Sequence, residues 1–238
     1  MTPQRTLLWK MIAATLTGEI VGGLYRAGDK LPTEADLAAR FGVNRHTVRQ
    51  ALAALAAAGT TFARQGAGVY IATVPTDYPL GRRVRFHQNV LATGRTPSRQ
   101  ILRCETRLAT PQEGVALTLQ DGALVHLVEG VSLADGVPVA MFRSVFPAQR
   151  FPNLPDALAR LNSVTQAMQE AGVNDYVRAS TRLTAKVADA LLARHLQIMQ
   201  GAPVLRSVAI NIDAQGAPVE FGTTWFAGDR VTLTVAPD

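Results

Sequence analysis

The sequence has 238 residues, of which 47% are hydrophobic and 18% are charged. This balance is typical of a folded globular protein and excludes a disordered chain, and the length indicates one or two domains. Residues 1–75 carry 8 Lys/Arg and 4 Asp/Glu, residues 76–100 carry 5 and 1, and residues 101–238 carry 11 and 13. The excess positive charge therefore lies in the first hundred residues, as expected for a part that meets a polyanion.

Cysteine content and hydropathy give expectations about the compartment. Cys104 is the single cysteine, which excludes an intramolecular disulfide. The longest run without a charge, between Arg49 and Arg64, is 14 residues long, whereas a membrane-spanning helix needs about 20 apolar residues. No convincing signal peptide precedes the first amphipathic segment. We expect a cytoplasmic protein with no membrane association.

Residues 5–22 have an apolar stripe at helical spacing and predict a first helix. Residues 31–55 then predict two short helices separated by a tight turn. Thr33 is the expected N-cap of the first, Gly42 ends it, and Asn44 caps the second. The second helix begins with Arg, His and Thr, which are residue types that reach phosphates and base edges when a helix enters the major groove. The alternative is an ordinary helical hairpin with a solvated polar face.

Two short strands around a glycine-rich turn are expected from TTFARQGAGVYIA. They would form the wing of a winged helix, with its tip at residues 64–68. Glycines at such a tip allow the backbone to come close to a groove floor or a phosphate.

The succession GGLYRAGDKLPTEADLAARFGVNRHTVRQALAALAAAG, followed by RQGAGVYI, resembles the winged-helix domain of the GntR family of bacterial transcriptional repressors. The resemblance covers about 70 residues without a gap. It implies that Arg45, Thr47 and Arg49 contact operator DNA and that the wing glycines enter the minor groove. Ala35 stands where some relatives have a basic residue. The DNA-binding residues that we expect are Thr33, Glu34, Asn44, Arg45, His46, Thr47, Arg49, Gln65, Gly66 and Gly68.

A linker is expected at residues 74–81, which are rich in proline and lack strong periodicity. It would join a DNA-binding domain at residues 1–73 to a second domain at residues 82–238. A helix is expected over residues 82–94. Its opening arginines, Arg82, Arg83 and Arg85, would receive an anion, form a second phosphate-binding patch near the hinge, or present a solvated basic face.

From residue 100 onward, strands outnumber helices and mostly follow one another, with Asp135-Gly136 as a hairpin turn. We therefore expect an α+β protein whose second domain is an antiparallel sheet with helices on one side. The phrases DGVPV, AQGAPVEFG and FAGDRVTLTV resemble the effector-sensing UTRA domain of the HutC branch of GntR regulators, which shares its fold with chorismate lyase. DYPLGRRVRFHQNVLATG and STRLTAKVADALLARHL resemble the phosphonate-metabolism regulators called PhnF.

The resemblance implies an effector site at the start of a helix, on two strand positions, at a Ser-containing helix start and at a Glu on a late strand. Relatives that bind sugar phosphates have arginines where Gly130 and Ser132 stand, so Arg143 and Arg182 are the available replacements besides the arginines at the helix start. The alternative for each is a surface residue whose aliphatic stem covers apolar neighbours. The effector-binding residues that we expect are Arg85, Phe86, His87, Ser132, Arg143, Ser163, Thr165, Arg182 and Glu220.

The expected protein is a homodimeric repressor that binds a palindromic operator and senses a small anion such as a phosphonate or phosphate. We expect no enzyme activity, cofactor or metal, because the four histidines have no metal-ligand spacing and no catalytic fingerprint is present. The alternatives are an enzyme that acts on a small carboxylate through a chorismate-lyase-like domain, and an architectural DNA protein that is indifferent to sequence.

Overall fold

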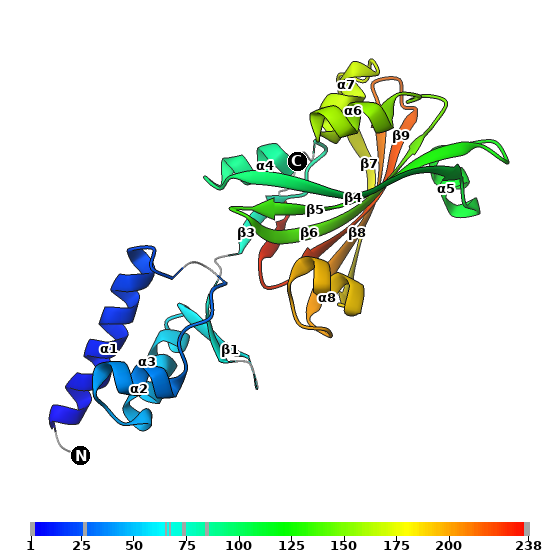
Figure 1. The fold of residues 1–238 in the computed structure, drawn as a ribbon. Coiled ribbons are helices and arrows are strands. Elements are labelled where there is room, and N and C mark those ends of the chain that lie inside the picture. Colours follow the sequence, from blue (N-terminus) through cyan, green and yellow to red (C-terminus); the bar gives the residue numbers. More distant parts are fainter. Residues whose placement is uncertain are drawn as a thin grey trace. The chain divides into compact units, whose positions relative to one another are not determined.

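The computed structural model of the chain describes residues 3–25, 28–64, 66, 68–72, 75–83 and 86–235. The chain forms two compact units, Met1–Val74 and Pro75–Asp238. Each unit has its own hydrophobic clusters. Figure 1 shows the fold of the two units as a ribbon. The arrangement within each unit decides where candidate functional side chains lie.

The first unit is a winged helix, as predicted. It contains α1 (Pro3–Val21), α2 (Glu34–Phe41), α3 (Arg45–Ala57), β1 (Thr61–Arg64) and β2 (Gly68–Ile71). The strands β1 and β2 pair antiparallel. One apolar cluster joins the three helices to β2, because residues at helical spacing on each helix face inward. Its buried members are Ile12, Leu16, Leu31, Leu37, Val48, Ala51, Leu52, Leu55 and Ile71.

The second unit is built on a six-stranded sheet in which every neighbouring pair is antiparallel. The strand order is β4 (Pro97–Leu108), β5 (Leu124–Ala134), β6 (Val137–Pro147), β9 (Pro218–Ala227), β8 (Pro203–Asp213) and β7 (Tyr176–Val187). The expected turn at Asp135-Gly136 joins β5 to β6, and both residues have positive φ.

Helices cover both faces of this sheet, so the expectation of helices on one side is wrong. Phe142 and Phe146 of β6 pack with α6 (Leu154–Leu161) and α7 (Val164–Glu170). Met141 and Val145 belong instead to the clusters of α8 (Ala190–Leu196) and α5 (Pro111–Leu117). Successive residues of a strand point to opposite faces, so α5 and α8 lie on the face opposite α6 and α7 (Figure 1). We call the α6–α7 side the inner face and the α5–α8 side the outer face.

The segment expected as a linker contains a strand. β3 (Thr76–Pro79) pairs in parallel with β10 (Val231–Thr234), near the end of the chain. The helix expected at residues 82–94 is shorter, since α4 begins at Phe86 and ends at Ala92. Tyr78, Phe86 and Phe226 form one aromatic cluster between these elements and the inner face.

Candidate functional site

The two helices of the first candidate site have the caps that the sequence predicts. Thr33 and Asp36 form a capping box at the start of α2, and Gly42 ends α2 in the left-handed conformation, with φ of 63°. At the start of α3, the Asn44 side chain accepts a hydrogen bond from the Thr47 backbone N–H at 2.9 Å. The caps at Thr33 and Asn44 satisfy N–H groups at the helix starts, and the Gly42 N–H satisfies carbonyl groups at the end of α2.

An ion pair joins the two helices at their exposed surface. Arg49 donates through Nε and Nη2 to the two carboxylate oxygens of Glu34, at 3.1 and 2.8 Å. This hydrogen bonding lowers the pKa of Glu34 and raises the pKa of Arg49. Arg45 and His46 are exposed beside them at the start of α3. The exposed beginning of α3 therefore presents two arginines and a histidine, one arginine being oriented by a neighbouring carboxylate.

Thr47 lies differently from the other expected DNA contacts. Its side chain is only 2% exposed, and its hydroxyl donates to Asn44 Oδ1 at 3.0 Å. Thr47 therefore stabilises the start of α3, and its hydroxyl is buried against the cap instead of exposed on the helix surface.

The wing is the hairpin of β1 and β2. Gly66 has φ of 72° and Gly68 has φ of 109°, which are conformations that side-chain-bearing residues rarely adopt. Gln65 lies outside the described residues.

A second candidate site is a cavity of about 550 Å³ on the inner face of the six-stranded sheet. Residues from α4, α7 and the sheet line it, together with Tyr78 of β3. Burial raises the pKa of Tyr78 to about 12, so its phenol stays protonated in the neutral range. Six of the expected effector-binding residues line this cavity, namely Phe86, His87, Ser132, Ser163, Thr165 and Glu220.

The start of α7 lies at the edge of this cavity. Ser163 accepts a hydrogen bond from the Gln166 N–H at 3.3 Å, so it caps α7. The Thr165 hydroxyl lies 3.2 Å from the Tyr176 hydroxyl. One N–H group at this helix start is thus already used by the helix's own cap.

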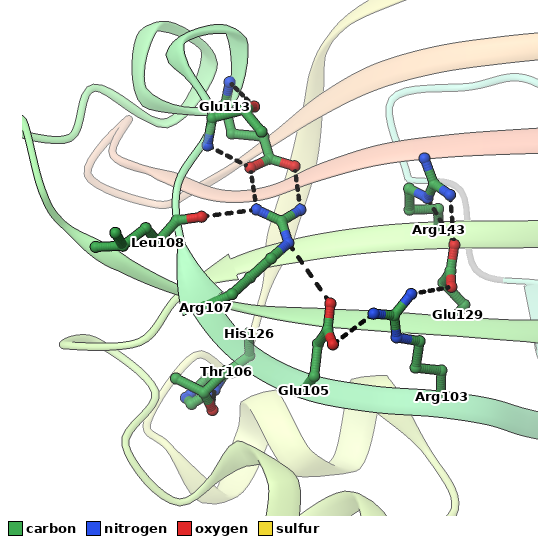
Figure 2. A network of polar contacts seen from close by, with 10 residues as sticks. Arg103, Glu105, Thr106, Arg107, Leu108, Glu113, His126, Glu129 and Arg143 are labelled. Atoms are coloured by element: carbon green, nitrogen blue, oxygen red, sulfur yellow. Dashed lines mark hydrogen bonds and ion pairs between the residues drawn. The ribbon is translucent and has the colours of Figure 1, made fainter.

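Arg143 and Arg182 lie on the outer face and do not line the cavity. Arg143 alternates along β6 with Phe142 and Ser144, which do line it. Arg143 instead pairs with Glu129 at 2.7 Å (Figure 2). Arg182 is exposed, and its register partner on β8 is Val208. Val208 and Arg143 are both register partners of Thr223 on β9, so Arg182 lies in the same row as Arg143 and on the same face of the sheet. Arg85 lies outside the described residues.

Two cavity arginines were missed by the sequence analysis. Arg99 on β4 is the register partner of Ser132, and its guanidinium carbon lies 4.6 Å from the Phe142 ring centroid. Burial lowers the pKa of Arg99, and the charge of Glu220 opposes this effect. Arg178 on β7 is the register partner of Asn211, and its Nε is buried with no hydrogen-bond partner among the described residues.

The Glu220 carboxylate is held in place by neutral donors. Ser144 Oγ donates to Glu220 Oε1 at 2.5 Å, and Asn211 Nδ2 donates to Oε2 at 2.6 Å. Within the part of the chain that the structure describes, no arginine or lysine forms an ion pair with Glu220. Among the described residues, the cavity therefore combines two guanidinium groups with one carboxylate that forms no ion pair.

The structure provides no metal-ligand set in the residues it describes, since no three His, Cys, Asp or Glu side chains are grouped suitably. His126, for example, is buried on β5 and hydrogen-bonds to Thr106 and to the Phe151 carbonyl, at 2.8 and 3.0 Å. Over the described ranges, no helix has the length and hydrophobicity to cross a bilayer.

Comparison with known proteins agrees with both units. A family model described as bacterial regulatory proteins, gntR family, matches residues 8–71, and the UTRA domain model matches residues 92–232. An uncharacterized HTH-type transcriptional regulator of Rhizobium meliloti (strain 1021) is 39% identical over 229 residues, which cover 96% of this chain and 94% of that protein.

Two proteins named PhnF are also similar. The probable transcriptional regulator PhnF of Escherichia coli (strain K12) is 31% identical over 237 residues, covering 95% of this chain and 94% of that protein. The crystal structure of PhnF from Mycobacterium smegmatis is 26% identical, with a TM-score of 0.66, and covers 95% of this chain and 99% of that chain. The chain therefore belongs to the gntR family of bacterial regulatory proteins, in the HutC branch with a UTRA domain, and it is a transcriptional regulator similar to PhnF rather than an enzyme.

Proposed function

We propose that the protein is a repressor that binds a palindromic operator as a homodimer in the cytoplasm, and that a small anion in the inner-face cavity changes its affinity for that operator. The cavity carries the effector part of the proposal, because Arg99 and Arg178 both line it. Among the described residues, neither arginine forms an ion pair with a carboxylate. A desolvated guanidinium favours an anionic partner. Phosphonate or phosphate is the proposed anion.

The exposed start of α3 supports the DNA part of the proposal. Arg45, His46 and Arg49 point away from the apolar cluster of the unit. In a two-fold symmetric dimer, two such helices match two half-sites of a palindrome. The backbone at Gly66 and Gly68 allows the wing to approach the neighbouring groove or phosphates.

Coupling between effector and DNA would be a shift between dimer arrangements that space the two helices correctly or incorrectly for the operator. β3 enters this proposal because it is the first strand of the second unit and also supplies Tyr78 to the cavity. An anion that contacts this cavity would thus act close to the point where the chain arrives from the DNA-binding unit.

The test has two stages. Operator duplexes are first selected from a randomised pool with the full chain, and a palindromic consensus is expected. Gel-shift titrations of the selected duplex are then repeated with phosphate, alkylphosphonates or sugar phosphates. At least one of these anions should change the apparent affinity. A consensus without two-fold symmetry would contradict the dimeric operator, and insensitivity to every anion would contradict the effector class.

A further inference from the structure

The inner-face cavity is lined by groups of both charge types, the guanidinium groups of Arg99 and Arg178 and the carboxylate of Glu220. Arg99 extends from β4 over the ring of Phe142, and the Phe86 ring lies 5.8 Å from its guanidinium carbon. Among the described residues, the only hydrogen bond found at Arg99 outside the sheet is the one that its backbone carbonyl accepts from Asn162. Phe142 can approach β4 because Gly130 has no side chain: a β-carbon there would lie 2.6 Å from Phe142 Cζ. The two rings therefore fix the position of a cation that is available to a ligand.

Arg178 approaches the same cavity from the far edge of the sheet. Both guanidinium groups act on one phenol, since the charges of Arg178 and Arg99 oppose the rise that burial causes in the pKa of Tyr78. Arg99, Arg178 and Tyr78 of β3 all line the same cavity. Arg178 also has a buried Nε with no partner among the described residues, and a ligand oxygen would satisfy this donor.

Glu220 is the counterpart of these cations. Its register partner on β8 is Asn211, which is in turn the register partner of Arg178 on β7, so the three residues form one row across the inner face. Ser144 and Asn211 each donate one hydrogen bond to its carboxylate. Each carboxylate oxygen can accept a further hydrogen bond. A hydrogen-bond donor on a ligand in the cavity can therefore bind to the Glu220 carboxylate while the hydrogen bonds from Ser144 and Asn211 remain.

We infer that Arg99 and Arg178 bind the oxyanion of the effector and that Glu220 accepts hydrogen bonds from an ammonium group of the same molecule, so that the effector is a compact zwitterion. This inference rests on the proposed function, in which an anion occupies this cavity. It adds that the anion also carries a positive charge.

The charges of such a ligand complement those of the cavity. The two arginines and Glu220 have a net charge of one positive unit. A dianionic phosphonate with one ammonium group has a net charge of one negative unit. A phosphonate without the ammonium group would bring two negative charges to the partly buried carboxylate of Glu220, and the charges of the two arginines and Glu220 would then sum with the ligand to one negative unit instead of zero. The cavity should therefore discriminate between the two.

The experiment is isothermal titration calorimetry on the full chain at pH 8, without DNA. The three probes are 2-aminoethylphosphonate, ethylphosphonate, which lacks the ammonium group, and ethanolamine, which lacks the phosphonate. The first should bind about tenfold or more tightly than the second. Ethanolamine should not bind measurably. Equal or tighter binding of ethylphosphonate would overturn the inference and leave the proposed function standing.

Variants locate the two contacts. Glu220→Gln should remove the preference for the ammonium group while retaining ethylphosphonate binding, and the matched control Glu170→Gln, exposed on α7, should keep the preference. Arg99→Met should lose both phosphonates, whereas Arg143→Met on the outer face should retain both. A Glu220→Gln variant that still prefers the aminated probe would refute the assignment of Glu220. Circular dichroism checks that each variant is folded, and the comparison of ligands on the unaltered chain needs no variant.

Failure of the two proposals can be distinguished. If neither phosphonate binds, the zwitterion inference is overturned. The proposed function is then judged separately, by whether phosphate or a sugar phosphate changes operator affinity in the gel shift.

Discussion

At the scale of single residues, Arg49 is a proposed DNA contact whose orientation the structure shows. Its guanidinium is exposed but held by two hydrogen bonds to Glu34. An exposed ion pair of this kind contributes little to stability, so its main consequence is to orient the arginine. Removal of Arg49 should therefore affect DNA binding much more than folding.

We expect Arg49→Ala to weaken binding to the selected operator by about tenfold or more, since one bidentate base contact contributes about 1–3 kcal/mol. The circular dichroism spectrum and the melting temperature should change little. Arg160→Ala is the matched control, because Arg160 is also exposed and paired with a glutamate, but on α6. Fluorescence anisotropy with a labelled duplex measures both variants. Unchanged affinity of Arg49→Ala would remove Arg49 from the interface.

His126 makes a prediction about pH. Burial lowers its pKa in the folded protein, and a hydrogen bond to the Phe151 carbonyl only partly opposes this. Below the unfolded value of about 6.5, the unfolded chain binds a proton that the folded chain does not, so stability falls as pH falls. Urea unfolding at pH 7.5 and pH 5.5 should show this loss, and His126→Gln should reduce it. An identical loss in the variant would assign the effect to other groups.

Position on a strand explains which effector residues the sequence could predict. Phe86, Ser163 and Glu220 follow from resemblance to a family whose site has a fixed place in the chain, and they line the cavity. The expectation for Arg143 and Arg182 depends on their charge, but alternation along a strand does not say which face carries the cavity. Arg99 and Arg178 could not be found from local sequence, because long-range register brings them beside Ser132 and Asn211.

At the scale of elements, an ionic network on the outer face connects α5 to the sheet (Figure 2). Arg107 of β4 donates two hydrogen bonds to Glu113 of α5, at 2.8 and 2.7 Å. Glu113 is buried and also completes the capping box of Thr110. The hydrogen bonds from Arg107 contribute most to lowering the pKa of Glu113. Loss of Arg107 would leave a buried carboxylate without its cation.

Arg107→Ala should therefore reduce the free energy of unfolding by about 3 kcal/mol, as is typical when one partner of a buried ion pair is removed. Arg103→Ala is the control, because Arg103 is mostly exposed, pairs with the partly exposed Glu105, and leaves Glu129 with Arg143 as its ion-pair partner. Its loss should cost less than about 1 kcal/mol. Urea unfolding at pH 7.5 measures both. Equal effects of the two substitutions would contradict the structural importance of the Glu113 contact.

Elements differ in how well the sequence predicts them. The winged helix was predicted because its caps and turn are local, as with Thr33, Gly42 and Asn44. β3 was missed because four residues rich in turn formers are a strand only through parallel pairing with β10. Helices on both faces were missed because the side that α5 and α8 occupy depends on chain crossings that local patterns do not record.

At the scale of the whole molecule, the chain joins a DNA-binding unit to a unit with a cavity, and the proposed repressor needs the two to be coupled. Residue patterns predicted both units, since each has its own apolar cluster. Patterns do not determine how a dimer arranges the units, because that depends on contacts between two copies. The central claim is therefore about linkage: an anion bound at Arg99 should alter binding of a duplex at α3.

The most direct test measures operator affinity by fluorescence anisotropy with and without a saturating phosphonate, for the full chain and for Arg99→Met. The account predicts that the phosphonate shifts the operator Kd of the unaltered chain by about tenfold, within the usual range of allosteric coupling. Arg99→Met should bind the operator as tightly as the unaltered chain without ligand but show no shift. The account would be contradicted if the phosphonate shifted the Kd of Arg99→Met by the same factor, or if no anion shifted the Kd of the unaltered chain.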